Sequence, residues 1–206
     1  MFKESLRSSF AEVGVALRDP EEFALRWDQE TGWRPVIWLA LGLTAVLGTT
    51  LYGMTMGIGL GAAAIAQRAM LLTVCAGLAW AIPLPALYVL NSLAGSRLRA
   101  STTLLAALVT TSWGGLAMVA SVPINWFFSV AIPAQVPMLF SETTAAHIVL
   151  GVNLLVFAGV GVSMCDLFRR VMDTLDPGGE RNPLWFLALV ATIGSQLFYL
   201  VGLFTW

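Results

Sequence analysis

Residues that could carry out chemistry are few in this sequence, and they are widely separated. The chain of 206 residues has one histidine, His147, and two cysteines, Cys75 and Cys165. These three residues form neither a C-x-x-C pair nor a His-Cys cluster, so no zinc site or disulfide scaffold is indicated. One histidine cannot supply bis-histidine haem ligation. Because no nucleophile-base-acid set or phosphate-binding glycine motif is apparent either, we expect a protein without catalytic residues, metal or cofactor.

Uncharged polar residues recur instead inside long apolar segments. At about 1.5 Å of helix rise per residue, Asn153 and Gln196 fall at a similar depth in neighbouring antiparallel segments. The candidate polar layer comprises Asn153, Gln196, Thr110 and Ser112, with Thr49, Thr111, Thr192 and Ser195 also near the middle. Such a layer either lines a cavity for a small polar group or joins helices by hydrogen bonds, and we favour hydrogen bonding between helices.

The composition defines the elements that must position these side chains. Apolar residues make up 58% of the chain and charged residues 11%, whereas soluble domains have about 45–50% and about 25%. This composition excludes a soluble globular enzyme and a disordered chain. Eleven basic residues against twelve acidic residues create no field that would attract nucleic acid.

The apolar segments predict an all-α fold. This fold is a polytopic membrane helical bundle with five transmembrane helices. A membrane-crossing helix needs about 20 mostly apolar residues. In lipid the backbone must be hydrogen-bonded internally, which favours helices. Pro83 and Pro85 predict a kink in the second segment. The five expected spans are about 35–58, 69–95, 100–122, 143–165 and 183–206, which together form a domain over 35–206.

The basic residues predict the orientation of the bundle. Ten of the eleven Lys and Arg residues fall in the N-terminal segment or in the two connections on the same side, and only Arg68 falls on the other side. Cytoplasmic loops carry the Lys/Arg excess. We therefore expect a multi-pass protein of the bacterial cytoplasmic membrane, with the N-terminus inside and the C-terminus outside.

Residues 1–34 predict a cytoplasmic leader of amphipathic, interfacial helices. Apolar residues at spacings of three and four give one stripe on a first helix. Asp19 can cap a second helix, in which Pro20 suits the first position. The stripe either docks a partner or lies on the membrane or on the protein's own bundle, and we favour the latter. The candidate partner-binding residues of the leader are Phe2, Leu6, Phe10, Val13, Leu17, Phe23 and Trp27.

The connection between the third and fourth spans, 123–141, is unusually apolar. No charged residue occurs from Ala100 through Ser141. The segment is expected to lie in the outer interface, to re-enter the membrane, or to bind another subunit through Trp126, Phe127 and Phe128.

Glycines mark expected close contacts between helices. Gly53, Gly57 and Gly61 are four residues apart, so they share one helix face. Gly114 with Gly115, and Gly159 with Gly161, are further candidates for close packing.

The order of these features resembles the bacterial Yip1-domain group. The similarity lies in the leader Asp19-Pro20-Glu21-Glu22-Phe23, in Thr31-Gly32-Trp33-Arg34-Pro35 before the first span, and in Leu90-Asn91-Ser92-Leu93-Ala94-Gly95 at the end of the second, followed by a short basic turn. The Asp-Leu-Tyr-Gly-Pro motif of the eukaryotic trafficking members is missing. The resemblance implies five spans, an internal N-terminus and a non-catalytic role.

The hypothesis from the sequence is a non-enzymatic scaffold or accessory subunit. Its expected partners are the lipid bilayer and another membrane protein or a further copy of the chain, without nucleic acid. The alternative is a permease-like or lipid-handling bundle, supported by the expected kink and the polar layer. An intramembrane enzyme is the third hypothesis.

Overall fold

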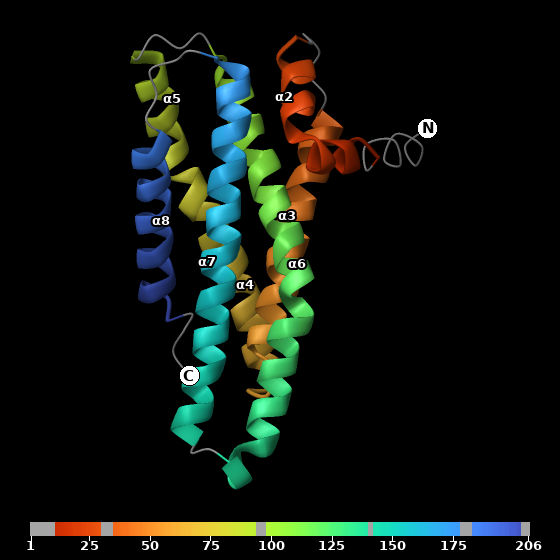
Figure 1. Ribbon diagram of the computed structural model, residues 1–206, viewed down its shortest axis with the longest axis vertical. Helices are drawn as coiled ribbons and strands as arrows, with labels where there is room; N and C mark the ends of the chain where they lie inside the picture. Colours follow the sequence, from red (N-terminus) through yellow and green to blue (C-terminus); the bar gives the residue numbers. More distant parts are fainter. Residues whose placement is uncertain (1–10, 30–34, 94–97, 140–141, 178–182, 203–206) are drawn as a thin grey trace.

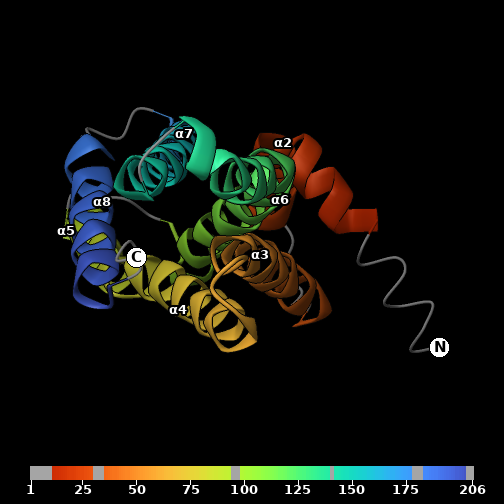
Figure 2. The ribbon, with the colours of Figure 1, turned by 90° about the horizontal axis from the view of Figure 1, so that it is seen from below.

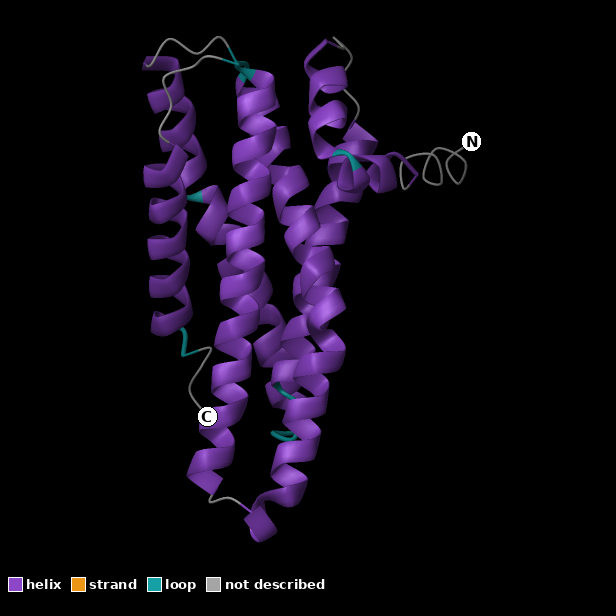
Figure 3. Cartoon of the chain, in the orientation of Figure 1, coloured by secondary structure: helices purple, strands orange, loops and turns teal. Residues whose placement is uncertain are grey.

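The computed structural model describes residues 11–29, 35–93, 98–139, 142–177 and 183–202, and these ranges are helical apart from short turns (Figures 1 and 3). A short helix over 11–18 precedes the labelled elements. These are α2 (Pro20–Gln29), α3 (Pro35–Met56), α4 (Ala62–Ala81), α5 (Pro83–Leu93), α6 (Ala100–Leu139), α7 (Glu142–Leu175) and α8 (Pro183–Leu200). The expectation of an all-helical bundle is confirmed for these residues.

Four of the helical segments are long and apolar enough to cross a membrane. They are Pro35–Met56, Ala62–Val89, Ala100–Ile132 and Thr143–Leu175. At about 1.5 Å per residue, each exceeds the thickness of a hydrocarbon core of about 30 Å. Helix α8 contributes a shorter apolar stretch, Ala188–Leu200. The described residues therefore form a helical bundle with four helices that could cross a membrane, as in a multi-pass membrane protein.

The second apolar segment is divided at its prolines, as expected. Helix α4 ends at Ala81 and α5 begins at Pro83. Ile82 keeps helical dihedral angles and donates its N–H to the carbonyl of Leu78. Pro83 has no N–H to donate, so the regular hydrogen-bond ladder stops there.

The expectation of a connection over 123–141 is wrong for residues 123–139. Helix α6 runs without interruption for 40 residues, from Ala100 to Leu139, through Pro123, Pro133 and Pro137. Neighbouring helices allow proline within membrane helices because they compensate for the lost backbone bond. Helix α7 likewise runs for 34 residues. Together α6 and α7 form a long antiparallel hairpin that extends past the end of α3 (Figure 1).

The described part of the leader packs on the chain's own bundle, which is one of the arrangements we favoured over partner binding. Val13, Phe23 and Trp27 are buried in one apolar cluster with residues of α3 and α6, and Leu17 packs against it. Phe2, Leu6 and Phe10 lie outside the described residues. The backbone N–H of Glu22 donates to Asp19 Oδ1 at 3.2 Å, which confirms the cap.

Glycines bring α3 close to its two main neighbours. A Cβ on Gly53 or Gly57 would meet the backbone of α4, so these two expectations are confirmed. Gly61 instead occupies the turn before α4 with φ +100°. Gly48 and Gly115 bring the backbones of α3 and α6 together.

Two other glycine expectations have different outcomes. A Cβ on Gly114 of α6 would meet the Met164 side chain of α7, so close packing is confirmed there. A Cβ on Gly159 or Gly161 would meet nothing within 4 Å. The expected tight contact at these two glycines is therefore wrong.

Candidate functional site

The most deeply buried polar group of α7 is Asn153, and it is bound to α3. The Tyr52 hydroxyl donates to Asn153 Oδ1 at 3.1 Å, and Asn153 Nδ2 donates to the Val149 carbonyl at 2.9 Å. Both Tyr52 and Asn153 are fully buried. The amide therefore joins two helices, which is the role we favoured for it.

A second buried amide, Asn125 of α6, lies near the end of α3. Its Nδ2 donates to Thr55 Oγ1 at 2.7 Å, and that hydroxyl donates to the Tyr52 carbonyl at 2.6 Å. In the described part of the chain, Asn125 Oδ1 and the hydroxyl of Ser129 are buried without a hydrogen-bond partner. We call Tyr52, Thr55, Asn125, Ser129 and Asn153 the polar cluster.

Sequence reasoning identified Asn153 alone in this cluster, and the reasons for missing Asn125 and Tyr52 can be identified. Asn125 was assigned to a loop, whereas its position four residues before Ser129 places both on one face of α6. Tyr52 was counted among the apolar residues. Its phenolic group needs a partner when it is buried in a span, and that requirement was a usable signal.

The expected polar layer is only partly assembled. Ser112 is buried and its hydroxyl contacts the Leu41 carbonyl of α3 at 2.7 Å. Thr110 is buried and bonds to the Ala106 carbonyl of its own helix at 2.8 Å. Gln196, Thr192 and Ser195 are exposed on α8. Gln196 therefore does not meet Asn153, and the expectation that these two share an environment is wrong.

Hydroxyl groups also join α3 and α4 near mid-span. Thr73 Oγ1 lies 3.2 Å from Thr49 Oγ1 and 2.9 Å from Thr50 Oγ1. Thr73 and Thr49 also bond to backbone carbonyls of their own helices. These contacts join neighbouring helices, as do those of Ser112 and Asn153.

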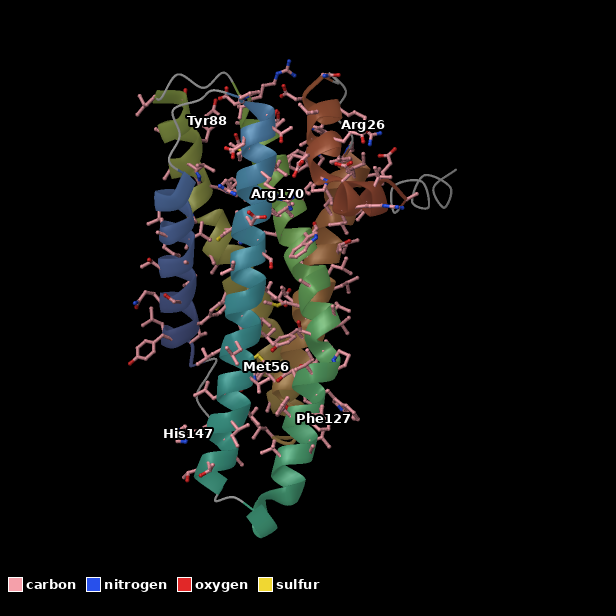
Figure 4. All side chains as sticks on the ribbon, in the orientation of Figure 1. Arg26, Met56, Tyr88, Phe127, His147 and Arg170 are labelled. Carbon is pink, nitrogen blue, oxygen red and sulfur yellow. The ribbon has the colours of Figure 1, made fainter. Side chains whose placement is uncertain are left out.

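Charged side chains gather at one end of the bundle (Figure 4). Arg170 of α7 forms an ion pair with Glu21 of α2 at 2.9 Å and another with Asp166 at 3.1 Å. All three side chains are 36–52% exposed, so these pairs contribute little to stability. Thr102 donates to Asp28 at 2.9 Å and joins α6 to α2.

The residues with potential for catalysis or metal binding remain apart. His147 is exposed at the opposite end of α7 from Arg170 (Figure 4). Cys75 and Cys165 are both free thiols. Among the described residues, no three His, Cys, Asp or Glu side chains are grouped so that they could hold a metal ion.

The C-terminal part of α6 exposes a large apolar surface. Trp126 and Phe127 are 52% and 57% exposed, and Ile124 and Val130 are 51% and 40% exposed. Phe128 is half-buried and makes an edge-to-face contact with Phe127. Because Asn125 bonds to Thr55, it marks the end of α3, and α6 continues for 14 residues beyond it. That extension is about 21 Å long.

Comparison of the chain with protein-family models, with curated proteins and with solved structures gives no match.

Replacement of Asn153 by leucine is expected to destabilise the bundle. It leaves the Tyr52 hydroxyl buried without an acceptor, which costs about 1–2 kcal/mol of unfolding free energy. Tyr52→Phe removes the donor and should restore part of that loss in the double variant. Thermal unfolding in mild detergent measures the effect, and an unchanged midpoint for Asn153→Leu would contradict the hydrogen-bonding role.

Replacement of Ser129 by alanine provides a contrasting case on α6. The Ser129 hydroxyl has no hydrogen-bond partner among the described residues, so its loss should leave the unfolding midpoint unchanged or raise it slightly. Ser121, eight residues earlier, bonds to the Ala117 carbonyl at 3.0 Å and serves as the control. A clear destabilisation by Ser129→Ala alone would show that this hydroxyl is bound.

Proposed function

We propose that the protein is a non-enzymatic membrane scaffold or accessory subunit that binds another membrane protein through the outer part of the α6–α7 hairpin. The observation that carries the proposal is the continuation of α6 for 14 residues past the end of α3. The described part of the leader, the other candidate surface, packs against the chain's own core.

The proposal includes five crossings, with the N-terminus in the cytoplasm of a bacterial cell. Arg26 and Arg170 lie near one end, and Phe127 and His147 lie at a similar level toward the other (Figure 4). From Arg170 to His147, α7 rises by 23 residues, or about 34 Å. This is close to one hydrocarbon core of about 30 Å. The basic end then faces the cytoplasm, and α8 provides the fifth crossing.

With Phe127 and His147 at the outer interface, lipid covers only part of the apolar surface of α6. Trp126 and Phe127 lie at the outer interface, where aromatic residues are favoured. The residues from Val130 to Leu139 extend outward from that level, and only Gln135 among them has a polar side chain. An apolar helix end outside lipid favours burial against another protein.

A photoreactive residue at position 130 tests this proposal. We expect Val130 to give one discrete adduct with a membrane protein that also co-purifies at a fixed ratio in mild detergent. The matched control is Val162, which is 71% exposed at mid-span on α7 and should label lipid. Adducts with lipid alone at position 130, from a protein that purifies without a partner, would overturn the proposal.

The permease-like alternative has less support. Its polar layer required Gln196 to join Asn153, but Gln196 lies on the exposed face of α8. Asn153 is held by Tyr52 and Val149. The break at Pro83 remains its one supporting feature. The relationship to the Yip1-domain group likewise stays a proposal, and it agrees with a non-catalytic role.

A further inference from the structure

Helix α8 presents a continuous exposed face that its own bundle leaves uncovered. Its opposite side packs on α4, where a Cβ on Gly194 would meet the Ala79 side chain at 3.3 Å. Viewed from below, α8 lies at the edge of the bundle beside α4 and α5 (Figure 2). On this exposed face, a row that we call the α8 stripe comprises Ala188, Ala191, Thr192, Ser195, Gln196 and Tyr199, and Leu200, which is also exposed, lies next to it.

Gln196 lies near the middle of the apolar part of the bundle. On α4, Ala79 is level with Gly194, and Arg68 donates to the Gly202 carbonyl at 2.7 Å. Gln196 therefore lies between these two levels and closer to Ala79. This position is near the centre of the apolar segment Ala62–Val89. The inference consequently requires α8 to lie in the membrane, as in the proposed function.

The chemistry of the stripe differs from that of a surface that faces lipid. The Thr192 and Ser195 hydroxyls bond to carbonyls of their own helix at 2.7 and 2.9 Å. The Gln196 amide makes no hydrogen bond within the described part of the chain, and lipid tails offer it none. Polar side chains in spans form hydrogen bonds across helices, and small residues allow those helices to approach.

We propose that the α8 stripe binds the same stripe of a second copy of this chain. Two copies inserted with the same orientation are related by a two-fold axis along the membrane normal. Each stripe residue then meets its own counterpart at the same depth. A glutamine amide both donates and accepts, so two Gln196 side chains satisfy each other. Ala188, Ala191, Thr192 and Ser195 are small enough for close contact around that pair.

Single-cysteine cross-linking in native membranes tests the two-fold arrangement. The background carries Cys75→Ala and Cys165→Ala. We expect disulfide-linked dimers of the chain from Ala188→Cys and Ser195→Cys. Val190→Cys, on the buried side of α8, and Val162→Cys, on the exposed side of α7, are controls that should remain monomeric. Stripe positions that form no dimers, or adducts of another mass, would overturn the proposal.

Gln196→Leu tests the amide itself with a side chain that lipid tolerates. We expect the dimer association constant in bilayers to fall about tenfold, which corresponds to about 1.4 kcal/mol. Leu200→Ala, next to the stripe, should leave the constant unchanged. An unchanged constant for Gln196→Leu would contradict the proposal. Labelling at Val130 in the same variant reports separately on the hairpin partner.

Discussion

Gly48→Ala is expected to prevent α3 from packing against α6. The added Cβ would overlap the backbone of Gly115, and a backbone cannot move aside as a flexible side chain can. Excess volume in a packed interior typically costs about 1–3 kcal/mol, and we expect at least the upper end here. The measured result should be a strongly lowered unfolding midpoint in detergent, or failure to recover folded protein.

A control on the same helix separates this clash from any general effect of alanine. A Cβ on Gly42 meets nothing within 4 Å, so Gly42→Ala should be neutral or slightly stabilising because alanine is the better helix former. Gly48→Leu should be at least as damaging as Gly48→Ala. Equal midpoints for the alanine variants at 42 and 48 would show that α3 and α6 do not approach as described.

Trp27→Ala is expected to release the leader from the bundle. Trp27 is 9% exposed, and its ring packs against Phe23 and edge-on against Trp38, with ring centroids 6.4 and 6.1 Å apart. Loss of a buried tryptophan from a core costs about 3–5 kcal/mol. Because the leader lies at one end, we expect local opening, measured as faster trypsin cleavage after Arg18 and Arg26.

The matched control for the leader is Leu25→Ala. Leu25 lies two residues away on α2 and is 39% exposed, so its truncation should leave the cleavage rate nearly unchanged. The span cores should resist trypsin in both variants. A leader that stays equally protected after Trp27→Ala would contradict its docking on α3 and α6.

The helices and their approximate order could be predicted from hydropathy alone. Long uncharged stretches require internal backbone bonding in lipid, and the break at Pro83 follows from the missing N–H. The prediction that the third span ends at about residue 122 was wrong, because α6 continues to Leu139 through Pro123, Pro133 and Pro137. That prediction placed Asn125 and Ser129 outside the expected bundle.

Which side chains bond to each other depends on how each helix is rotated about its own axis in the bundle. No short sequence pattern predicts this rotation. Asn153 and Gln196 were matched by depth, yet Asn153 faces Tyr52 of α3 while Gln196 faces outward from α8. Gly115 was identified as a packing residue, but its counterpart Gly48 lies outside the Gly53–Gly57–Gly61 series. The depth of a residue along a span can be found by counting residues, whereas the direction in which its side chain faces is set by the packing of the whole bundle.

Cysteine accessibility in intact cells tests the central claim that the α6–α7 hairpin emerges from lipid at the end opposite to the arginine-rich end. In the background without Cys75 and Cys165, and with the chain expressed in excess over its partner so that the hairpin is uncovered, Val130→Cys should react with a membrane-impermeant maleimide added outside. Gly14→Cys should react only after permeabilisation, and Val162→Cys should not react in either case. Labelling of Gly14→Cys from outside, with Val130→Cys protected until permeabilisation, would contradict the account.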